Sequence, residues 1–160
     1  MISICPGCGL KLASNDQSIN ERFNASSACW QLYGKLSVFT LSLRDKAFIH
    51  QLIVDAYAAQ HSGPQVKTIT TTFALIGLYL TFEKGYTGKQ VQRTHMFLGK
   101  NRAVWPRFNP PQNKSALTVL DVLQSPESQY EAMIRKWGKS VWEMWQPEHE
   151  NVRKLIEPLI

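Results

Sequence analysis

The sequence predicts an all-α fold, a single-domain bundle of four to five helices. Apolar residues recur three and four positions apart over several stretches, as one buried helix face requires. Each stretch lies between residues that start or stop helices, mainly serine, glycine and proline. No strand-like alternation and no internal repeat stand out. A length of 160 residues with 44% hydrophobic content is enough for one domain over residues 1–160 with a sizeable core.

The first 25 residues are the exception to the helical pattern. They lack periodicity and contain many turn-forming residues, namely Gly9, Ser14, Asn15, Asp16, Asn20 and Asn24. We therefore expect residues 1–25 to be an irregular segment that needs an anchor, and residues 26–160 to form the helical bundle.

Three helices are predicted next, over about residues 26–41, 46–61 and 66–84. Ser26 or Ser27 can cap the first helix, and Gly63-Pro64 ends the second. The third stretch is almost wholly apolar, so we expect it at the centre of the bundle.

Two shorter helices follow. Thr87 opens one that runs to about Leu98, and Thr118 caps a single turn to about Leu123. Between them, residues 105–111 form a proline-rich connection, either a surface loop or an extended arm packed by its two aromatic residues.

The last long helix starts at Ser125-Pro126, a serine cap followed by a first-turn proline. Pro147 kinks or restarts this helix, and Pro158 closes it. Its predicted buried stripe consists of Met133, Ile134, Trp137, Val141 and Trp145.

Residues 5–9, Cys-Pro-Gly-Cys-Gly, are the clearest candidate for chemistry. Pro6 fixes φ at about −65°, and Gly7 and Gly9 can adopt the positive φ that tight turns require. Such a turn brings both thiols within reach of one tetrahedral ion, and cysteines at this spacing are typical of zinc knuckles. We therefore expect Zn²⁺ as the cofactor, bound by Cys5 and Cys8.

Two further ligands are needed, because zinc in structural sites takes four. Cys29 is the only other thiol, and an odd count of three cysteines argues against a disulfide framework. The first two helices should form an antiparallel hairpin, in which Cys29 and His61 lie about equally far from the turn and become neighbours. His50, on the same helix as His61, lies about 16 Å from it. The predicted metal ligands are Cys5, Cys8, Cys29 and His61.

Two other clusters offer alternatives. His50, Val54, Tyr57 and His61 share one stripe of the second helix, where His50 with Asp55 could act in acid–base chemistry or simply form ordinary hydrogen bonds. Trp142, Trp145 and His149 form either an aromatic ligand wall or part of the core.

The charge of the chain suggests a nucleic-acid partner as another alternative. The formal net charge is +6 and the isoelectric point about 9.3. The densest basic region runs from Lys84 to Lys114, where Trp105 and Phe108 could stack on bases and Arg102 and Arg107 could contact phosphates. The alternative is an ordinary solvated surface, because the basic residues form no run.

Several classes of protein are excluded by the sequence. No apolar stretch reaches the length of a membrane span, and the N-terminus has no signal-peptide pattern, so we expect a cytoplasmic protein without a membrane partner. Phosphate-binding glycine loops, His-Glu-x-x-His and Gly-x-Ser-x-Gly are absent, and the cysteines do not fit the zinc deaminase pattern.

Four segments together resemble a bacterial family catalogued only as a domain of unknown function. They are Cys5 to Gly9, Cys29-Trp30 followed by Tyr33, Asp55 to His61, and Ser140 to Glu143. The family pattern continues with Pro-Gly after Gln-His, whereas this chain has Ser62-Gly63-Pro64. The resemblance covers nearly the full length and implies a single domain with Cys5, Cys8, Cys29 and His61 as signature positions. It implies no activity.

The sequence thus predicts a small zinc-binding helical protein. The metal is structural, since protein fills all four positions, and the function is binding of a protein or small-molecule ligand. Two alternatives stay open: a metal-dependent enzyme of the helical-bundle type with His50, His61 and His149 around the ion, and a nucleic-acid-binding protein.

Overall fold

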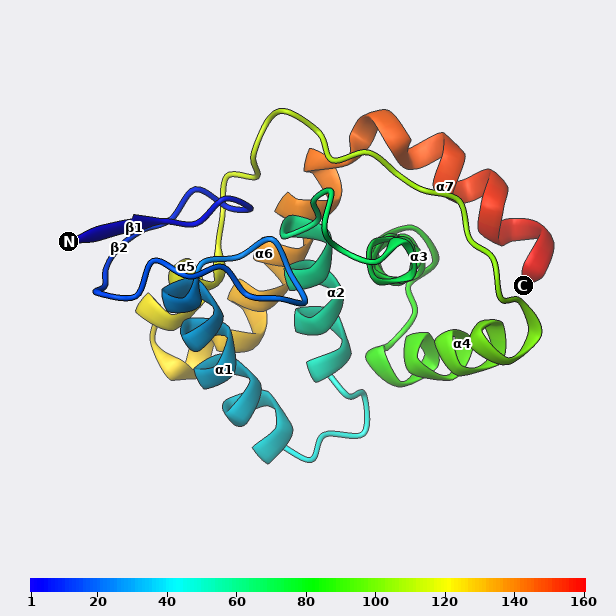
Figure 1. The fold of residues 1–160 in the computed structure, drawn as a ribbon. Helices are drawn as coiled ribbons and strands as arrows, with labels where there is room; N and C mark the ends of the chain where they lie inside the picture. The colour runs from blue at the N-terminus through cyan, green and yellow to red at the C-terminus, as the bar shows by residue number, and fades with distance from the viewer.

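The computed structural model describes all 160 residues, and most of them are helical (Figure 1). The helices are α1 (Ser27–Ser42), α2 (His50–Gln60), α3 (Thr68–Lys84), α4 (Gly88–Asn101), α5 (Val119–Gln124), α6 (Tyr130–Met144) and α7 (His149–Ile156). Three short 3₁₀ helices cover Glu127–Gln129, Gln146–Glu148 and Glu157–Leu159, and two strands cover Ile2–Ile4 (β1) and Lys11–Ala13 (β2). None of the helices has both the length and the apolar character needed to cross a membrane.

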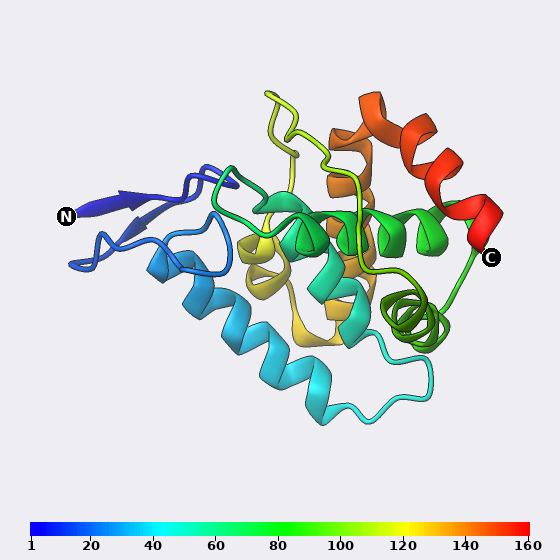
Figure 2. The ribbon, with the colours of Figure 1, turned by 45° about the vertical axis from the view of Figure 1, so that its right-hand side comes forward.

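The N-terminal segment contains a β-hairpin, which the sequence did not predict. β1 pairs antiparallel with β2, with Ser3 opposite Leu12. The Cys5 N–H donates to the Leu10 carbonyl at 2.8 Å, so the pairing extends to the Cys-Pro-Gly-Cys-Gly turn. Both views show the hairpin projecting at one end of the molecule (Figures 1 and 2). The prediction of a wholly irregular segment was wrong because three-residue strands are too short to show alternation.

α3 lies at the centre of the bundle, as its apolar sequence predicts. It packs against α2, α4, α6 and α7, and Figure 2 shows it crossing the neighbouring helices. Leu75, Ile76 and Leu78 on this helix are fully buried. Gly85 ends the helix with φ of +69° in the left-handed region, which glycine adopts without a steric penalty.

Two predicted boundaries differ from the structure. α2 starts at His50, because Phe48 has a φ of +56° and the Asp45 carboxylate accepts from the Ile49 N–H at 2.9 Å. The predicted last helix is divided into α6 and α7 by the 3₁₀ turn that contains Pro147. The split of the last helix, together with the single-turn α5, gives seven α-helices where four to five were expected.

The first two helices are arranged as the hairpin argument requires. The N-terminus of α1 and the C-terminus of α2 lie at the same end of the bundle, next to the β-hairpin (Figure 1). The Ser26 side chain caps α1 by accepting from the Cys29 N–H at 3.2 Å. This cap fixes Cys29 in the first turn of the helix.

Candidate metal centre

Three separate segments bring Cys5, Cys8, Cys29 and His61 together. The first two residues lie in the β1–β2 turn, Cys29 lies in the first turn of α1, and His61 directly follows α2. One potential ligand atom from each residue lies within 4.8 Å of all the others. The Cys8 and Cys29 sulfurs are 3.8 Å apart, and the Cys29 sulfur is 3.5 Å from His61 Nε2. The structure therefore gathers all four residues that the sequence selected.

The distances fit the edges of a metal-centred tetrahedron. With Zn–S bonds of about 2.3 Å and a Zn–N bond of about 2.0 Å, tetrahedral geometry separates two sulfurs by about 3.8 Å and a sulfur from a nitrogen by about 3.5 Å. A disulfide would instead require about 2.05 Å, and all three cysteines are free thiols. The group is therefore compatible with one tetrahedral metal ion.

The two glycines of the turn serve different purposes. Gly9 has a φ of +81° and its N–H donates to the Cys5 carbonyl at 2.8 Å. Gly7 has no positive φ, but a Cβ there would lie 2.5 Å from the Asn24 carbonyl oxygen and 2.6 Å from the His61 ring. The prediction of positive φ thus holds for Gly9, whereas Gly7 is required for close packing against His61.

Polar contacts hold the turn and the ligands in place. The Lys114 ammonium donates to the carbonyls of Pro6 and Gly7, both at 2.9 Å. The Asn24 N–H donates to the His61 carbonyl at 2.8 Å. The segment before α1 and the loop before α5 therefore both support the site.

Tyr57 orients two of the ligands, a role that the sequence reasoning did not assign. His61 Nδ1–H donates to the Tyr57 carbonyl at 2.8 Å, which leaves Nε2 facing the Cys29 sulfur. The Tyr57 hydroxyl donates to the same sulfur at 3.3 Å, and its ring stacks on His61 with centroids 3.9 Å apart. Such contacts set the tautomer and orientation of metal ligands. The feature of the sequence that could have predicted this role is the spacing of four residues between Tyr57 and His61.

The electrostatics of the cluster favour a cation at its centre. Cys29 and His61 are fully buried, and Cys5 is 1% exposed. The adjacent Cys5 and Cys8 sulfurs, together with burial, raise the pKa of the Cys29 thiol, whereas hydrogen bonds from Cys29 and Cys8 lower the pKa of Cys5. Without a cation, the cluster therefore favours ionisation of one cysteine and disfavours ionisation of all three. A divalent ion would stabilise all three thiolates.

The histidine-lined alternative is not supported by the structure. His50 Nδ1 is bonded to the Thr40 hydroxyl at 2.8 Å, and His149 stacks on Trp142 and donates to its carbonyl at 2.7 Å. Neither histidine belongs to a ligand group with His61. The structure therefore does not bring together His50, His61 and His149, the ligand set of the alternative metalloenzyme hypothesis.

The two other predicted side-chain clusters also have simpler roles. Asp55 accepts from Gln51 at 3.2 Å and forms no hydrogen bond with His50. Trp145 is fully buried and donates to the Ala59 carbonyl at 3.0 Å, so it belongs to the core.

The predicted stacking platforms for nucleic acid are buried. Trp105 and Phe108 are each 7% exposed, and Trp105 contacts Phe73 edge-on. Arg102 lies over the Trp105 ring, and Arg107 donates to backbone carbonyls of the loop after α2. Base stacking on these aromatic residues is therefore a wrong prediction.

Comparison with known families places the site in a wider context. A family model covers residues 3–146 of the chain. The chain belongs to the Family of unknown function (DUF5946). This confirms the resemblance to a domain of unknown function, and the matched DUF5946 region includes all four candidate ligands. No curated protein and no solved structure matches the chain.

Proposed function

We propose that this protein binds one zinc ion through Cys5, Cys8, Cys29 and His61, and that the ion is structural. The observation that carries the proposal is a buried set of three thiols and one imidazole at tetrahedral spacing. This donor set is characteristic of structural zinc, and it leaves no coordination position for water or substrate.

The position of the ion explains what it stabilises. It would join the β-hairpin, the start of α1 and the end of α2, three segments that are far apart in sequence. A metal that binds only the folded chain contributes its binding free energy to folding. The N-terminal hairpin has only two strands, which are marginal without such an anchor.

We further propose that the single domain is a binding module rather than a metalloenzyme. Burial of the four ligands keeps substrates away from the ion. Three unpaired thiols suit a reducing compartment, which supports the cytoplasmic location.

Metal analysis of purified variants tests the zinc centre. Wild-type protein should contain one zinc per chain, and Cys29→Ser and His61→Ala should lose most of it. His50→Ala is the matched control and should keep its zinc, because His50 contacts Thr40 rather than the cluster. Full zinc content in Cys29→Ser would overturn the proposed ligand set.

A cobalt-substituted sample tests the structural role. Co²⁺ bound by three thiolates and one imidazole should give a tetrahedral visible spectrum that does not change when azide is added. A spectral change with azide would show an open coordination position, and the ion would then be accessible for catalysis.

A further inference from the structure

The outward side of α4 combines basic and large apolar residues. With about 3.6 residues per turn, these residues lie on the side of the helix away from Val91 and Leu98, which are buried in the bundle. We call this surface the α4 face, and its members are all exposed: Lys89, Arg93, Met96, Phe97 and Lys100.

The two apolar members of the α4 face are not part of the core. Met96 is 57% exposed and Phe97 is 56% exposed. The contact of α4 with the bundle is made by its other side, where Val91 and Leu98 lie. Adjacent large apolar residues among charged ones, exposed on one surface, are typical of an interaction site. Packing within the chain does not account for this pair.

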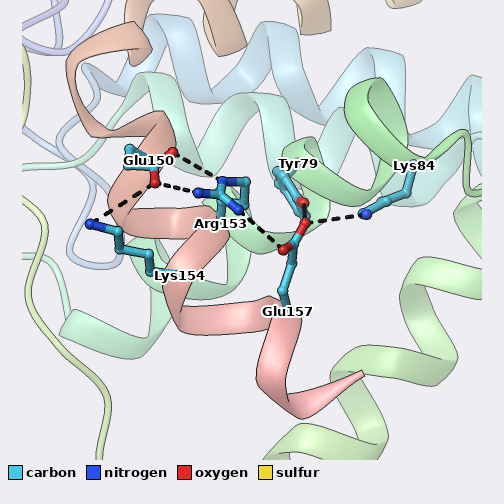
Figure 3. Close-up of polar contacts among 6 residues, drawn as sticks. All are labelled: Tyr79, Lys84, Glu150, Arg153, Lys154 and Glu157. Carbon is cyan, nitrogen blue, oxygen red and sulfur yellow. Dashed lines mark hydrogen bonds and ion pairs between the residues drawn. The ribbon is translucent and has the colours of Figure 1, made fainter.

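Basic residues elsewhere in the molecule have acidic partners. Near the C-terminus, Arg153 pairs with both Glu150 and Glu157 (Figure 3). Lys154 also pairs with Glu150, at 3.9 Å, and Lys84 pairs with Glu157 at 3.2 Å. The charges of this second basic cluster are therefore balanced inside the chain.

The charges of the α4 face are not balanced in this way. Lys89, Arg93 and Lys100 form no ion pair in the structure. Residues 84–120 contain no aspartate or glutamate, so α4 has no acidic residue of its own. The α4 face therefore presents three unpaired positive charges to solvent, and its electrostatic complement is an anionic surface.

The connection between α1 and α2 adjoins the α4 face at its N-terminal end. The Lys89 N–H donates to the Ala47 carbonyl at 2.9 Å, and both views show the connection and α4 at the same lower edge of the molecule (Figures 1 and 2). In this connection Leu43 is 44% exposed and Lys46 is exposed. Its one acidic residue, Asp45, accepts a backbone N–H just before α2. The connection thus repeats the combination of apolar and basic side chains.

This combination fits an anionic bilayer better than a nucleic acid. Both partners present negative groups that attract lysine and arginine. A bilayer also has an apolar layer directly beneath its headgroups, where exposed side chains such as Met96 and Phe97 can be buried. Contacts to a duplex are mostly to phosphate and sugar, which offer these two side chains little apolar surface.

We propose that the α4 face docks on an anionic membrane surface. Lys89, Arg93 and Lys100 contact the charged headgroups, and Met96 and Phe97 enter the boundary between headgroups and acyl chains. The helix lies along the surface, because its first and last basic residues are about 16 Å apart along the axis. Such a contact needs no membrane-spanning helix, so the proposal replaces the expectation that the protein has no membrane partner. It goes beyond the proposed binding role and does not depend on the metal centre.

Co-sedimentation of the zinc-loaded full chain with lipid vesicles tests the proposal at physiological ionic strength. The vesicles contain phosphatidylcholine alone or phosphatidylcholine mixed with phosphatidylserine. We expect saturable binding to the mixed vesicles and at least about tenfold weaker binding to the neutral ones, because the basic residues then have no anionic partner. No binding to the mixed vesicles, or equal binding to both kinds, would overturn the proposal.

A DNA duplex at the same concentration of anionic groups is the competing partner. We expect the duplex to bind more weakly than the mixed vesicles, because it leaves Met96 and Phe97 in water. Tighter binding of the duplex would assign the α4 face to nucleic acid and overturn the choice of a membrane.

Two double variants with the same change of charge locate the contact. Lys89→Gln with Lys100→Gln should weaken binding to the mixed vesicles about 25-fold, or about fivefold for each lysine near the lipid surface. Lys136→Gln with Lys139→Gln removes two exposed lysines from α6 and should bind nearly as wild type does. Equal losses in the two double variants would show attraction by net charge alone and contradict the assignment.

A third pair of variants tests the apolar part of the contact. Phe97→Ser should weaken binding to the mixed vesicles about tenfold, since it removes the side chain that is buried on docking. Ile2→Ser is the control, because Ile2 is 60% exposed on the β-hairpin rather than on α4. An unchanged affinity in Phe97→Ser would refute burial in the bilayer. All the substituted residues are exposed, and the vesicle comparison on wild type decides the question without them.

Discussion

Replacing Tyr57 by phenylalanine removes a single hydroxyl from the proposed zinc centre. That hydroxyl donates to the Cys29 sulfur at 3.3 Å. The ring remains, and with it the stacking on His61 at 3.9 Å and on Tyr33 at 4.2 Å. The substitution therefore tests one hydrogen bond with little change in packing.

The expected magnitude depends on the charge of the sulfur. A hydrogen bond to a charged group contributes about 1.5–3 kcal/mol, and loss of groups that bond to metal ligands weakens metal affinity about 10–100-fold. Since tenfold corresponds to about 1.4 kcal/mol, the two ranges agree. In metal-free protein the Cys29 thiol is neutral, because its pKa is raised by Cys5, Cys8 and burial. Tyr57→Phe should then change the stability of metal-free protein by no more than about 1 kcal/mol.

Zinc competition against a chromophoric chelator measures the affinity, and urea unfolding of the metal-free protein measures the stability. Tyr33→Phe is the matched control, because Tyr33 stacks on Tyr57 but its hydroxyl donates to none of the sulfurs. We expect a 10–100-fold loss, by the same principle, only in Tyr57→Phe. Equal zinc affinity in Tyr57→Phe and wild type would refute the reasoning that the hydroxyl stabilises a metal-bound thiolate.

Three further predictions follow from the same structure. Gly7→Ala places a Cβ 2.5 Å from the Asn24 carbonyl oxygen, so urea unfolding should show that the free energy of unfolding falls by about 1–3 kcal/mol. The control Gly34→Ala, where a Cβ would have nothing within 4 Å, should raise the free energy of unfolding by about 0.5–1 kcal/mol. Equal effects of the two substitutions would contradict the packing argument. Burial lowers the pKa of His95 to about 4 from 6.5, so as the pH falls the unfolded chain takes up a proton at this residue before the folded chain does. The free energy of unfolding should therefore decrease between pH 6.5 and 4, by at most about 3 kcal/mol. His95→Gln should lose that part of the decline in pH-dependent unfolding curves, and an unchanged pH dependence would show that His95 is not the group. Metal removal by a chelator should lower the melting temperature. Adding back zinc at about 1,000 times its dissociation constant should restore about 4 kcal/mol of unfolding free energy. An unchanged melting temperature after metal removal would contradict a structural ion.

The helices and the candidate ligands were largely predictable from sequence because both depend on local patterns. Thr87 and Gln90 form a capping box at the start of α4, where Thr87 was expected to open a helix. Cys29 and His61 meet because helix rise and a short connection fix which ends of two helices are neighbours. Those arguments need no knowledge of the remaining core.

The features that sequence reasoning missed depend on contacts between distant segments. The left-handed conformation of Phe48, which delays α2, accompanies close packing of its carbonyl against Gly88. The sequence left open whether Trp105 and Phe108 pack the connection after α4 or lie exposed on a loop, and only the fold shows that both are buried against the core. Asp55 likewise lines a cavity that forms between segments brought together only by the fold. The sequence gives no signal that its Oδ2 atom is buried without a hydrogen-bond partner.

X-ray absorption at the zinc edge tests the central claim most directly, because it reports the number and type of ligand atoms on the ion. The proposed centre predicts three sulfurs at about 2.3 Å and one nitrogen at about 2.0 Å, with no bound water oxygen. A first shell with fewer than three sulfurs, or protein that contains no zinc, would contradict it.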